Sequence, residues 1–412
     1  MKRGDFHLNK RTLAMALSLL LMGGILCSLY ILNRQNYNLY QEYRPKETIE
    51  VWASTPALIE LCDRFERKYP EVHINRRYFY NQDVLLEELT AALSAGTYPD
   101  MAEIGSHYGL LPLIETGLPL ALNEMMGEEE RSALHAGIRS RFEYDGKLWA
   151  WPIGFSIPIL FYHKNLLDYY EPGVVSATVW DDLWQLSARL QDTVRKNNPA
   201  FWGFHTDTQT PWYLLTMLSQ LGRTDRLPQQ IEALTARGSG AFTQWERALK
   251  TYALFPRLTH QMAVTQFVNG LGGILLSSSE KLPLLERLIA GKFQLGALPL
   301  PRMEQGGEEG NLAGGKGLML LANTSGKKEV ALTVLKFLNE QEQLDYFSGE
   351  TGYIPAIMPP PGQELIRRYT NVPLFDKTLR EEMGRIKPLA PTPADRDVWE
   401  RIRKRQEQLE QE

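Results

Sequence analysis

Between residues 49 and 104 the chain alternates between strand-like and helix-like segments, and this alternation constrains the fold more than any other feature. The expected segments are a strand at 49–52, a helix at 56–69, a strand at 72–76, a helix at 83–95 and a strand at 101–104. Connections of this kind build a parallel sheet with helices on both faces, and the crossovers are right-handed. Ligands of such sheets bind beyond the carboxyl ends of the strands. The topology therefore predicts an α/β fold with a binding site at the loops 52–55 and 105–107.

The length and the charge of the chain narrow the classes of protein it can belong to. Its 412 residues are too many for one ordinary domain and are sufficient for two lobes with separate cores. A net charge of -4 provides no basic surface, so we expect no nucleic-acid partner. The seven histidines are scattered and the two cysteines, Cys27 and Cys62, lie in unlike segments, so we expect neither a zinc site nor a disulfide, and no cofactor.

The N-terminal 46 residues have the character of an export or anchoring segment. Lysines and arginines near the start precede an uncharged apolar run at 12–32, which as a helix would be about 31 Å long and could cross a bilayer. A cleaved signal peptide has a shorter apolar core, and a lipoprotein signal would need a small residue where Leu26 precedes Cys27. We favour an uncleaved anchor over a cleaved signal, with residues 33–46 as a stalk and the remainder outside the cytoplasm.

The second half of the chain is mainly helical by pattern from 165 to 290, and strand-like runs return later. The expected strands are 273–276, 294–298 and 317–321, and the expected helices are 180–196, 211–221, 242–254 and 327–339. The charged segment from 401 to 412 is expected to be a frayed helix.

Several segments, in order along nearly the whole exported part, resemble one known family. They are IEVWASTPALIELCDRFERKYPEVHI, LTAALSAGTYPDMAEI, ETGLPLALNE, YDGKLWAWPIGFSIPILFYHKNLL, ATVWDDL, GALPLP, NLAGGKGLML, EVALTVLKFL and TGYIP. In these segments the chain resembles the extracellular solute-binding proteins of ABC importers, in the group of the maltose-binding and glycerol-3-phosphate-binding proteins. It departs from the family pattern at His163, where an asparagine is more usual, and at the prolines 359–361, which follow TGYIP at one rim of the expected cleft.

The resemblance implies a two-lobed periplasmic-binding-protein fold of type II, preceded by the N-terminal segment. By analogy the first α/β lobe comprises 47–154 and 298–354, and the second comprises 155–297 and 355–412. The ligand would lie between the lobes and hold them closed by contacting both. The family also implies a monomeric receptor that delivers its ligand to the permease subunits of an ABC transporter.

Three candidate ligand-binding residues follow the predicted strands of the first lobe. Trp52 ends the first strand and could stack on the apolar face of a sugar, or it could pack beneath the first helix. Thr55 is suited to cap that helix, and it could also bind a hydroxyl at the helix N-terminus. Ser106 ends the third strand, either as a ligand contact or as a turn residue.

Three further candidates lie where the chain enters and builds the second lobe. Ser156 aligns with a small polar position common in the family, and Trp212 opens a helix that could provide the floor of the second half-site. Ser278 lies in a serine run that resembles a ligand-contacting cluster of the sugar-phosphate branch, although a solvated loop would look the same.

The last three candidates lie in the C-terminal third. Gly315 would let the backbone approach a ligand closely, and the family often places a ring such as that of Tyr353 at the cleft. Arg385 could meet an acidic group of the ligand, or it could form an ordinary salt bridge.

The function expected from these features is binding of a carbohydrate, either an oligosaccharide or a sugar phosphate, without catalysis. The segment 310–317 approaches a phosphate-binding loop, but Gly317 stands where a magnesium-binding serine or threonine is required. The acidic pair Asp181 and Asp182 opens a helix, where negative charge is favoured in any case. A carbohydrate-active enzyme is therefore disfavoured. A membrane-tethered sensor for a separate signalling protein is the alternative that the N-terminal segment motivates.

Overall fold

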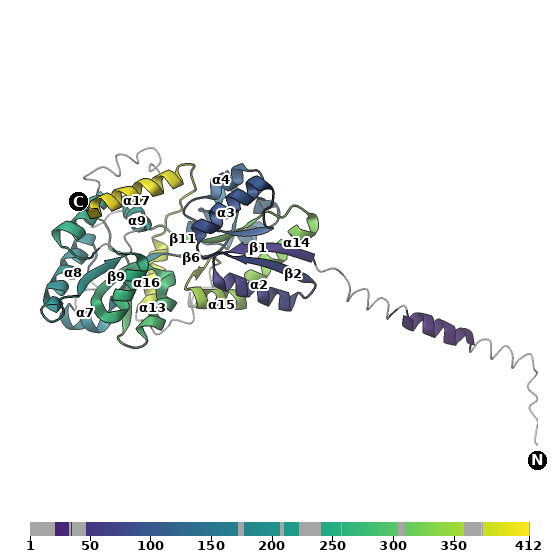
Figure 1. Ribbon diagram of the computed structural model, residues 1–412, viewed down its shortest axis with the longest axis horizontal. Coiled ribbons are helices and arrows are strands. Elements are labelled where there is room, and N and C mark those ends of the chain that lie inside the picture. The colour runs from purple at the N-terminus through teal and green to yellow at the C-terminus, as the bar shows by residue number, and fades with distance from the viewer. Residues whose placement is uncertain are drawn as a thin grey trace, which may run out of the picture.

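Two β-sheets organise the protein into two lobes, which lie side by side along its long axis (Figure 1). The computed structural model describes residues 21–32, 34, 47–171, 177–206, 210–221, 240–256, 258–303, 310–357, 372 and 374–411. The two-lobed α/β arrangement that the sequence predicts is present in this part of the chain.

The first lobe contains a six-stranded sheet in the order β12-β6-β11-β3-β1-β2. Its N-terminal elements are β1 (Glu47–Ala53), α2 (Pro56–Lys68), β2 (Val72–Tyr78), α3 (Gln82–Ala95) and β3 (Met101–Gly105). Strands β1, β2 and β3 are parallel, as predicted. The Asn81 side chain caps α3 by accepting from the Val84 amide at 2.8 Å, and Gly96 ends this helix in the left-handed region with φ of 73°. These local signals explain why the segment 49–104 was predictable.

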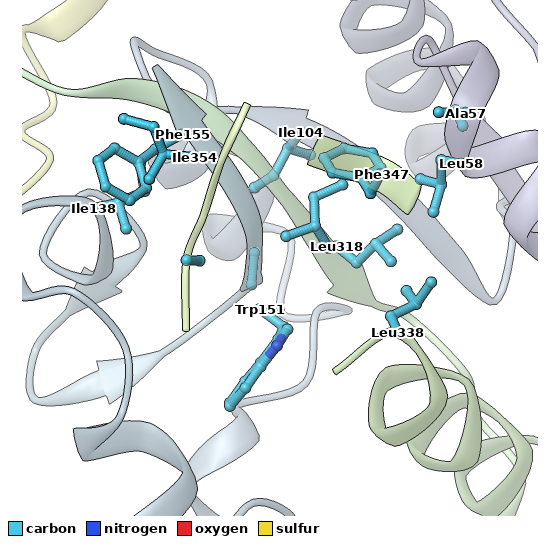
Figure 2. Close-up of a cluster of buried hydrophobic side chains, with 14 of the residues drawn as sticks. Ala57, Leu58, Ile104, Ile138, Trp151, Phe155, Leu318, Leu338, Phe347 and Ile354 are labelled. Atoms are coloured by element: carbon cyan, nitrogen blue, oxygen red, sulfur yellow. The ribbon is translucent and has the colours of Figure 1, made fainter. Parts of the chain in front are cut away.

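The remaining strands of the first sheet come from distant parts of the chain. They are β6 (Trp151–Ser156), β11 (Gly314–Leu320) and β12 (Ile354–Pro355), and all their pairings are antiparallel. Helices α14 (Ser325–Leu338) and α15 (Gln341–Thr351) also belong to this lobe. Figure 2 shows side chains from these segments, among them Trp151, Phe155, Leu318 and Phe347, gathered in one buried cluster around the sheet. Burial of this apolar surface is the main force that joins the segments.

The second lobe contains a four-stranded sheet in the order β10-β7-β9-β8. Its strands are β7 (Pro158–His163), β8 (Trp202–Thr206), β9 (Gly272–Ser278) and β10 (Leu295–Leu298). The helices around it include α7 (Lys164–Tyr170), α8 (Trp180–Arg195), α9 (Trp212–Gln220), α11 (Gly240–Glu246), α12 (His260–Gln266), α13 (Leu282–Ile289) and α16 (Phe375–Gly384). Only Ile157 separates β6 from β7, so the chain leaves the first sheet and enters the second within one residue. The lobe boundaries predicted from the sequence stay a proposal, and β6 continues two residues past the one at 154.

The expectation of a frayed C-terminal helix is wrong. Helix α17 (Asp395–Gln411) packs on the second lobe through Val398, Ile402 and Leu409, which belong to that lobe's core. Most of its side chains are charged, which hides the narrow apolar stripe, but the stripe is buried and holds the helix in place.

The described part of the N-terminal segment, residues 21–32, is helical and exposed. Within the described ranges, no helix combines the length and the apolar character needed to cross a membrane. The predicted membrane segment at 12–32 lies partly outside the described residues.

Candidate ligand-binding cleft

Two cavities lie between the lobes, and each is lined by residues from both. We call the first the polar compartment; it has a volume of about 590 Å³. It is lined by Ser54, Thr55, Pro56, Ala57, Asn81, Gln82, Glu280, Lys281, Pro283, Leu284, Arg287, Lys316, Tyr346, Glu350, Thr351 and Tyr353. We call the second the aromatic compartment; it has a volume of about 510 Å³. It is lined by Gln82, Asp83, Leu86, Gly105, His107, Tyr108, Thr210, Trp399, Glu400, Arg403 and Glu407. Gln82 lines both, and both volumes are in the usual range for small-molecule sites.

The first-lobe wall of the polar compartment is built around the buried carboxylate of Glu103, on β3. The backbone amides of Ser54 and Thr55 donate to it at 3.1 and 3.0 Å, and their hydroxyls donate at 2.7 and 3.0 Å. Burial alone would raise the pKa of Glu103, but the ammonium of Lys316 and these hydrogen bonds lower it below its usual value. Glu103 is therefore an ionised group whose partners are supplied by its own lobe.

Lys316, on β11, lines the polar compartment and forms an ion pair with the buried Glu103. Its Nζ lies 2.9 Å from Glu103 Oε1, and it donates to Gln82 Oε1 at 2.6 Å and to Ser54 Oγ at 3.0 Å. With three acceptors around it, the ammonium is fixed in position. The cleft is therefore lined here by an ammonium whose charge is balanced by the buried Glu103.

A second carboxylate, Glu280, faces this wall from the second lobe. It follows β9, retains 19% side-chain exposure, accepts from Ser278 Oγ at 3.1 Å and lies 3.1 Å from Lys281 Nζ. Burial would raise its pKa, but Lys281, a hydrogen bond from Ser156 and the charge of Lys316 lower the pKa of Glu280 to about 2. Glu280 is therefore ionised in the cleft.

Tyr353 completes the contact between the lobes at this compartment. Burial, the charges of Glu280 and Glu103, and a hydrogen bond with Glu280 raise the pKa of the Tyr353 hydroxyl well above its usual value. The hydroxyl thus stays protonated and donates to Glu280 across the cleft. A first-lobe side chain and a second-lobe side chain meet here directly.

The aromatic compartment has a neutral histidine at its base. The His107 ring lies with its centroid 5.3 Å from that of Trp212 and 4.7 Å from that of Trp399, both from the second lobe. Burial and the nearby charge of Arg141 lower the pKa of His107 to about 3, so the ring is uncharged near neutral pH. The Tyr108 hydroxyl, at one side of this compartment, donates to Asp83 Oδ1 at 2.6 Å.

The sequence of the chain is similar to that of known binding proteins. Residues 60–358 match the family model described as bacterial extracellular solute-binding protein. The chain belongs to this family. Binding proteins from Brucella abortus and Brucella suis are 28% identical to this solute-binding protein over 137 residues, which are 33% of this chain and 32% of theirs. The chain thus matches about a third of the length of these relatives.

Solved structures share the fold over most of the chain. A maltose/maltodextrin-binding domain from Bdellovibrio bacteriovorus, bound to maltotriose, has a TM-score of 0.71 at 19% identity and covers 88% of this chain and 94% of its own. UgpB from Mycobacterium tuberculosis, in complex with glycerophosphocholine, also has a TM-score of 0.71, at 18% identity, and covers 88% and 98%. At these identities the likeness concerns the fold of the solute-binding protein.

Of the residues proposed from the sequence, Thr55 and Tyr353 line the polar compartment of the solute-binding protein. Thr55 precedes α2, yet its hydroxyl donates to Glu103 and makes no helix-cap hydrogen bond. Ser156 and Ser278 contact Glu280 from behind, and Trp212 supports His107 while its indole donates to the Leu312 carbonyl at 3.1 Å. These three act on the cleft through another side chain.

Ser106 and Gly315 lie beneath the cleft and bind each other. Ser106 Oγ accepts from the Gly315 amide at 2.8 Å, and the Ser106 amide donates to the Gly315 carbonyl at 3.0 Å. A Cβ on Gly315 would lie 2.6 Å from the Gly154 carbonyl oxygen. The glycine is thus needed for close packing of β11 on β6, and the structure does not place it against either compartment.

Trp52 and Arg385 both have structural roles. Arg385 forms the salt bridge that the sequence left open as an alternative, whereas the contacts of Trp52 are with Phe79 and Glu50, and its packing beneath the first helix stays a prediction. Trp52 is 3% exposed, packs on Phe79 at 5.3 Å and donates its indole N–H to Glu50. Arg385 lines a separate cavity and donates to Glu382 Oε1 at 2.9 Å and to the Leu300 carbonyl at 3.2 Å. Neither lines a cleft compartment, because each is held by partners within its own neighbourhood.

Several lining residues of the cleft were not among the candidates chosen from the sequence: Gln82, His107, Glu280, Lys316 and Trp399. His107 lies within the loop 105–107 that the topology predicted as part of the site. Glu103, buried behind the polar compartment, was also not chosen. Glu103 and His107 flank the carboxyl end of β3, where the topology already predicted a site. Lys316 directly follows the double glycine, and Glu280 directly follows the serine run. For Trp399 the sequence contained no signal.

Proposed function

We propose that this solute-binding protein captures a carbohydrate outside the cytoplasm by closing its two lobes and delivers it to the permease of an ABC transporter. The observation that carries the proposal is the polar compartment, where hydroxyl, amide and paired charged groups of both lobes surround one cavity. A sugar offers hydroxyls that both donate and accept, together with apolar C–H faces that suit aromatic rings.

The charges of the polar compartment favour an uncharged sugar over a sugar phosphate. Lys316 is paired with Glu103, and Lys281 is paired with Glu280. A phosphate would meet cations whose charge is already balanced, whereas a hydroxyl can donate to Glu280 or accept from Lys281. Arg287, at the rim, is exposed, and solvent screens its charge. Of the two neighbours described above, one binds maltotriose, which has no charged group, and the other binds glycerophosphocholine, which has a phosphate and a quaternary ammonium. The balanced pairs of this compartment favour a ligand of the first kind.

Closure of the lobes follows from the distribution of the lining residues. A ligand in the polar compartment touches Ser54 and Lys316 of the first lobe and Glu280 of the second. Contacts of this kind exist only when the lobes are together, so binding shifts the equilibrium toward the closed form. The permease would then recognise the closed form.

A screen for ligand-induced stabilisation tests the proposal. The purified protein is heated with neutral mono-, di- and trisaccharides, with sugar phosphates, and alone. A ligand at 100 times its dissociation constant adds about 2.7 kcal/mol to the free energy of unfolding, which gives a clear rise in Tm. If no sugar raises Tm, the carbohydrate assignment is wrong; if only sugar phosphates do, the preference for uncharged ligands is wrong.

Attachment to the membrane through residues 12–32 is a separate proposal, and it rests on the apolar composition of that run. Expression of the full chain followed by carbonate extraction of membranes checks it. Recovery in the extracted membrane pellet, at the mass of the uncleaved chain, supports an anchor. Release at a mass shorter by the N-terminal segment supports a cleaved signal.

A further inference from the structure

A short segment between the last two helices of the second lobe lies against both lobes. It joins α16 to α17, and we call its residues 386–394 the strap. Ile386 packs against the core of the first lobe, whereas Leu389 and Ala394 pack against the core of the second. The strap is therefore a contact between the lobes in addition to the segments that carry the chain from one sheet to the other.

The backbone of the strap is stiff. It contains three prolines: Pro388, Pro391 and Pro393. Each proline fixes its own φ at about −65° and restricts the residue before it. At the start of the strap, the Asn311 amide donates to the Arg385 carbonyl and the Lys387 amide donates to the Asn311 carbonyl, both at 3.0 Å. A segment restricted in this way loses little conformational entropy when another group binds it.

The first lobe contacts the strap through α6 (Ala136–Arg139) and the residues that follow this helix. Ser140 Oγ accepts from the Leu389 amide at 3.0 Å. A Cβ on Gly137 would lie 2.2 Å from Cγ2 of Ile386, so the glycine is needed for α6 to approach the strap this closely. The two lobes thus meet here by direct packing and by a hydrogen bond.

Arg141 connects the strap to the cleft. Its Nε donates to the Ser106 carbonyl at 2.8 Å, and its Nη2 donates to the His107 carbonyl at 2.9 Å, both in the loop 105–107. Its Nη1 donates to the Leu389 carbonyl of the strap at 3.2 Å. A guanidinium has five N–H donors in a rigid plane, so one side chain can hold the loop and the strap together.

The contacts of Arg141 are made away from bulk water, since its side chain is only 7% exposed. Asp395, the first residue of α17, supplies the counter-ion: its Oδ2 lies 3.5 Å from Arg141 Nη2. The Thr392 hydroxyl donates to Asp395 Oδ1 at 2.6 Å and holds the carboxylate in place. Loss of one partner would leave a buried charge or carbonyl without its hydrogen bond, which is costly.

The loop 105–107 carries part of the lining of the aromatic compartment. Gly105 and His107 line this cavity, and the His107 ring packs on that of Trp212 at 5.3 Å. We propose that Arg141 is a positioning residue for ligand binding, which holds this loop against the strap and so fixes the His107 ring in the cleft. The inference rests on the proposed function and deepens it, because Arg141 itself lines neither compartment and acts on a ligand only through the loop.

A merely structural role for Arg141 would have a different signature. If the side chain only stabilised the fold, its substitution would lower the Tm and leave the His107 ring and the ligand affinity unchanged. If it positions the loop, a change at the strap end of its contacts alters both the surroundings of His107 and the affinity.

The first test needs no ligand and follows the imidazole Cε1–H resonance of His107 in the full-length protein. In the wild type this resonance is shifted by the ring currents of Trp212 and Trp399, whose centroids lie 5.3 and 4.7 Å from that of His107. Asp395→Asn removes the counter-ion at the strap and leaves the bonds to the loop, and we expect it to move the resonance toward that of an exposed histidine. Arg141→Lys should move it further, because an ammonium cannot bind all four acceptors at once.

Two matched variants serve as controls. Asp397→Asn removes a carboxylate from the exposed side of α17 that pairs with Arg401. Arg139→Lys alters an arginine of α6 that pairs with Glu143. Neither should move the His107 resonance. A resonance that stays at its wild-type position in both Asp395→Asn and Arg141→Lys would overturn the inference.

The second test measures affinity by titration calorimetry with glucose, maltose, maltotriose and the other neutral sugars of the stability screen. We expect about threefold weaker binding in Asp395→Asn and about tenfold weaker binding in Arg141→Lys. The double variant should bind no more weakly than Arg141→Lys, because both substitutions act through the same guanidinium.

The outcomes separate this inference from the proposed function. Wild-type affinity in both variants, or a double variant whose loss is the product of the two single losses, would overturn the role of Arg141 while the carbohydrate proposal stands. If no sugar binds the wild type, the carbohydrate proposal is wrong, and the His107 resonance alone decides whether Arg141 positions the loop.

Discussion

The two carboxylates of the polar compartment, Glu103 and Glu280, are both ionised, yet they are held in different ways. Glu103 is fully buried and takes all its hydrogen bonds from Ser54, Thr55 and Lys316 of its own lobe. Glu280 keeps part of its surface exposed and has partners from both sides of the cleft, including Tyr353.

Glu103 therefore contributes to the stability of the first lobe alone, whereas Glu280 contributes to the contact between the two lobes. The surroundings of Glu103 stay the same whether the lobes are open or closed, because its partners move with it. The surroundings of Glu280 and of His107 depend on closure. Substitutions at Glu103 should therefore act on stability, and substitutions at Glu280 and Tyr353 should act on binding and on the closed form. Substitution of His107 should change how stability depends on pH.

Substitution of Glu103 should have the largest effect, a loss of stability. Glu103→Gln leaves Lys316 without its counter-ion in a largely buried position, so we expect the free energy of unfolding to fall by about 3 kcal/mol. Urea denaturation followed by circular dichroism measures this. Glu87→Gln, on the exposed side of α3, is the control. A loss below about 0.5 kcal/mol would remove the distinction between the two carboxylates.

His107 should make stability depend on pH. Its pKa is lowered to about 3 in the folded protein from an ordinary value near 6.5, because burial and Arg141 disfavour the charged ring. The unfolded chain therefore binds a proton that the folded chain does not, so stability present above pH 6.5 is lost as the pH falls toward 3. The loss approaches about 1.4 kcal/mol per pH unit, or about 2 kcal/mol between pH 6.5 and 5.

Denaturation of the wild type and of His107→Phe at several pH values checks this assignment. The variant should lack that part of the slope, while the other buried histidines, such as His205, continue to contribute theirs. Glu280 cannot account for the same slope, since its pKa of about 2 places its own loss of stability between pH 4.5 and 2. An unchanged slope in the variant would mean that His107 is not buried by the second lobe in solution.

Glu280 should affect ligand affinity more than stability. Glu280→Gln keeps the size of the side chain but replaces charge-assisted hydrogen bonds by neutral ones, so we expect about tenfold weaker binding of the sugar identified by the stability screen. Calorimetry measures the dissociation constant, and Glu329→Gln, exposed on α14, is the control. Unchanged affinity together with reduced stability would make Glu280 resemble Glu103.

The same contrast explains which parts of the molecule could be predicted from the sequence. The segment from β1 to β3 was predictable because periodicity, a proline and a glycine all indicated the same element boundaries. Strand β8 was missed because it is short and contains Gly203, a poor strand former. The structure shows the reason for that glycine: a Cβ there would lie 2.1 Å from the Ser187 carbonyl oxygen of α8.

Some residues of the cleft could be predicted from the sequence and others could not, because the latter depend on long-range contacts. Thr55 and Tyr353 were identified because they stand at places that topology or family resemblance indicates. Glu103 resembles an ordinary polar residue in an alternating strand until its partners from β1 and β11 are known. Trp399 lies in a charged helix whose position on the second lobe depends on packing against residues far away in the sequence, such as those of α8 and α9. Long-range contacts of this kind leave no local pattern.

Substitution of Tyr353 should have the smallest effect of those considered, and it tests the contact between the first lobe and Glu280 alone. Tyr353→Phe removes one hydroxyl, and with it the hydrogen bond that joins the first lobe to Glu280. We expect about fivefold weaker sugar binding, equivalent to about 1 kcal/mol, because the closed form loses one contact and the open form loses none. The free energy of unfolding should change less, since the ring still packs on Phe347 at 6.0 Å.

Scattering and calorimetry together decide where that loss arises. Tyr80→Phe removes a hydroxyl from a side chain that is 74% exposed and serves as the control. If Tyr353→Phe weakens binding and also expands the unliganded protein, the Tyr353–Glu280 contact stabilises closure before a ligand arrives. If it weakens binding with no change in dimensions, the hydroxyl acts on the ligand directly. Full affinity and unchanged dimensions would mean that Glu280, like Glu103, depends on its own lobe alone.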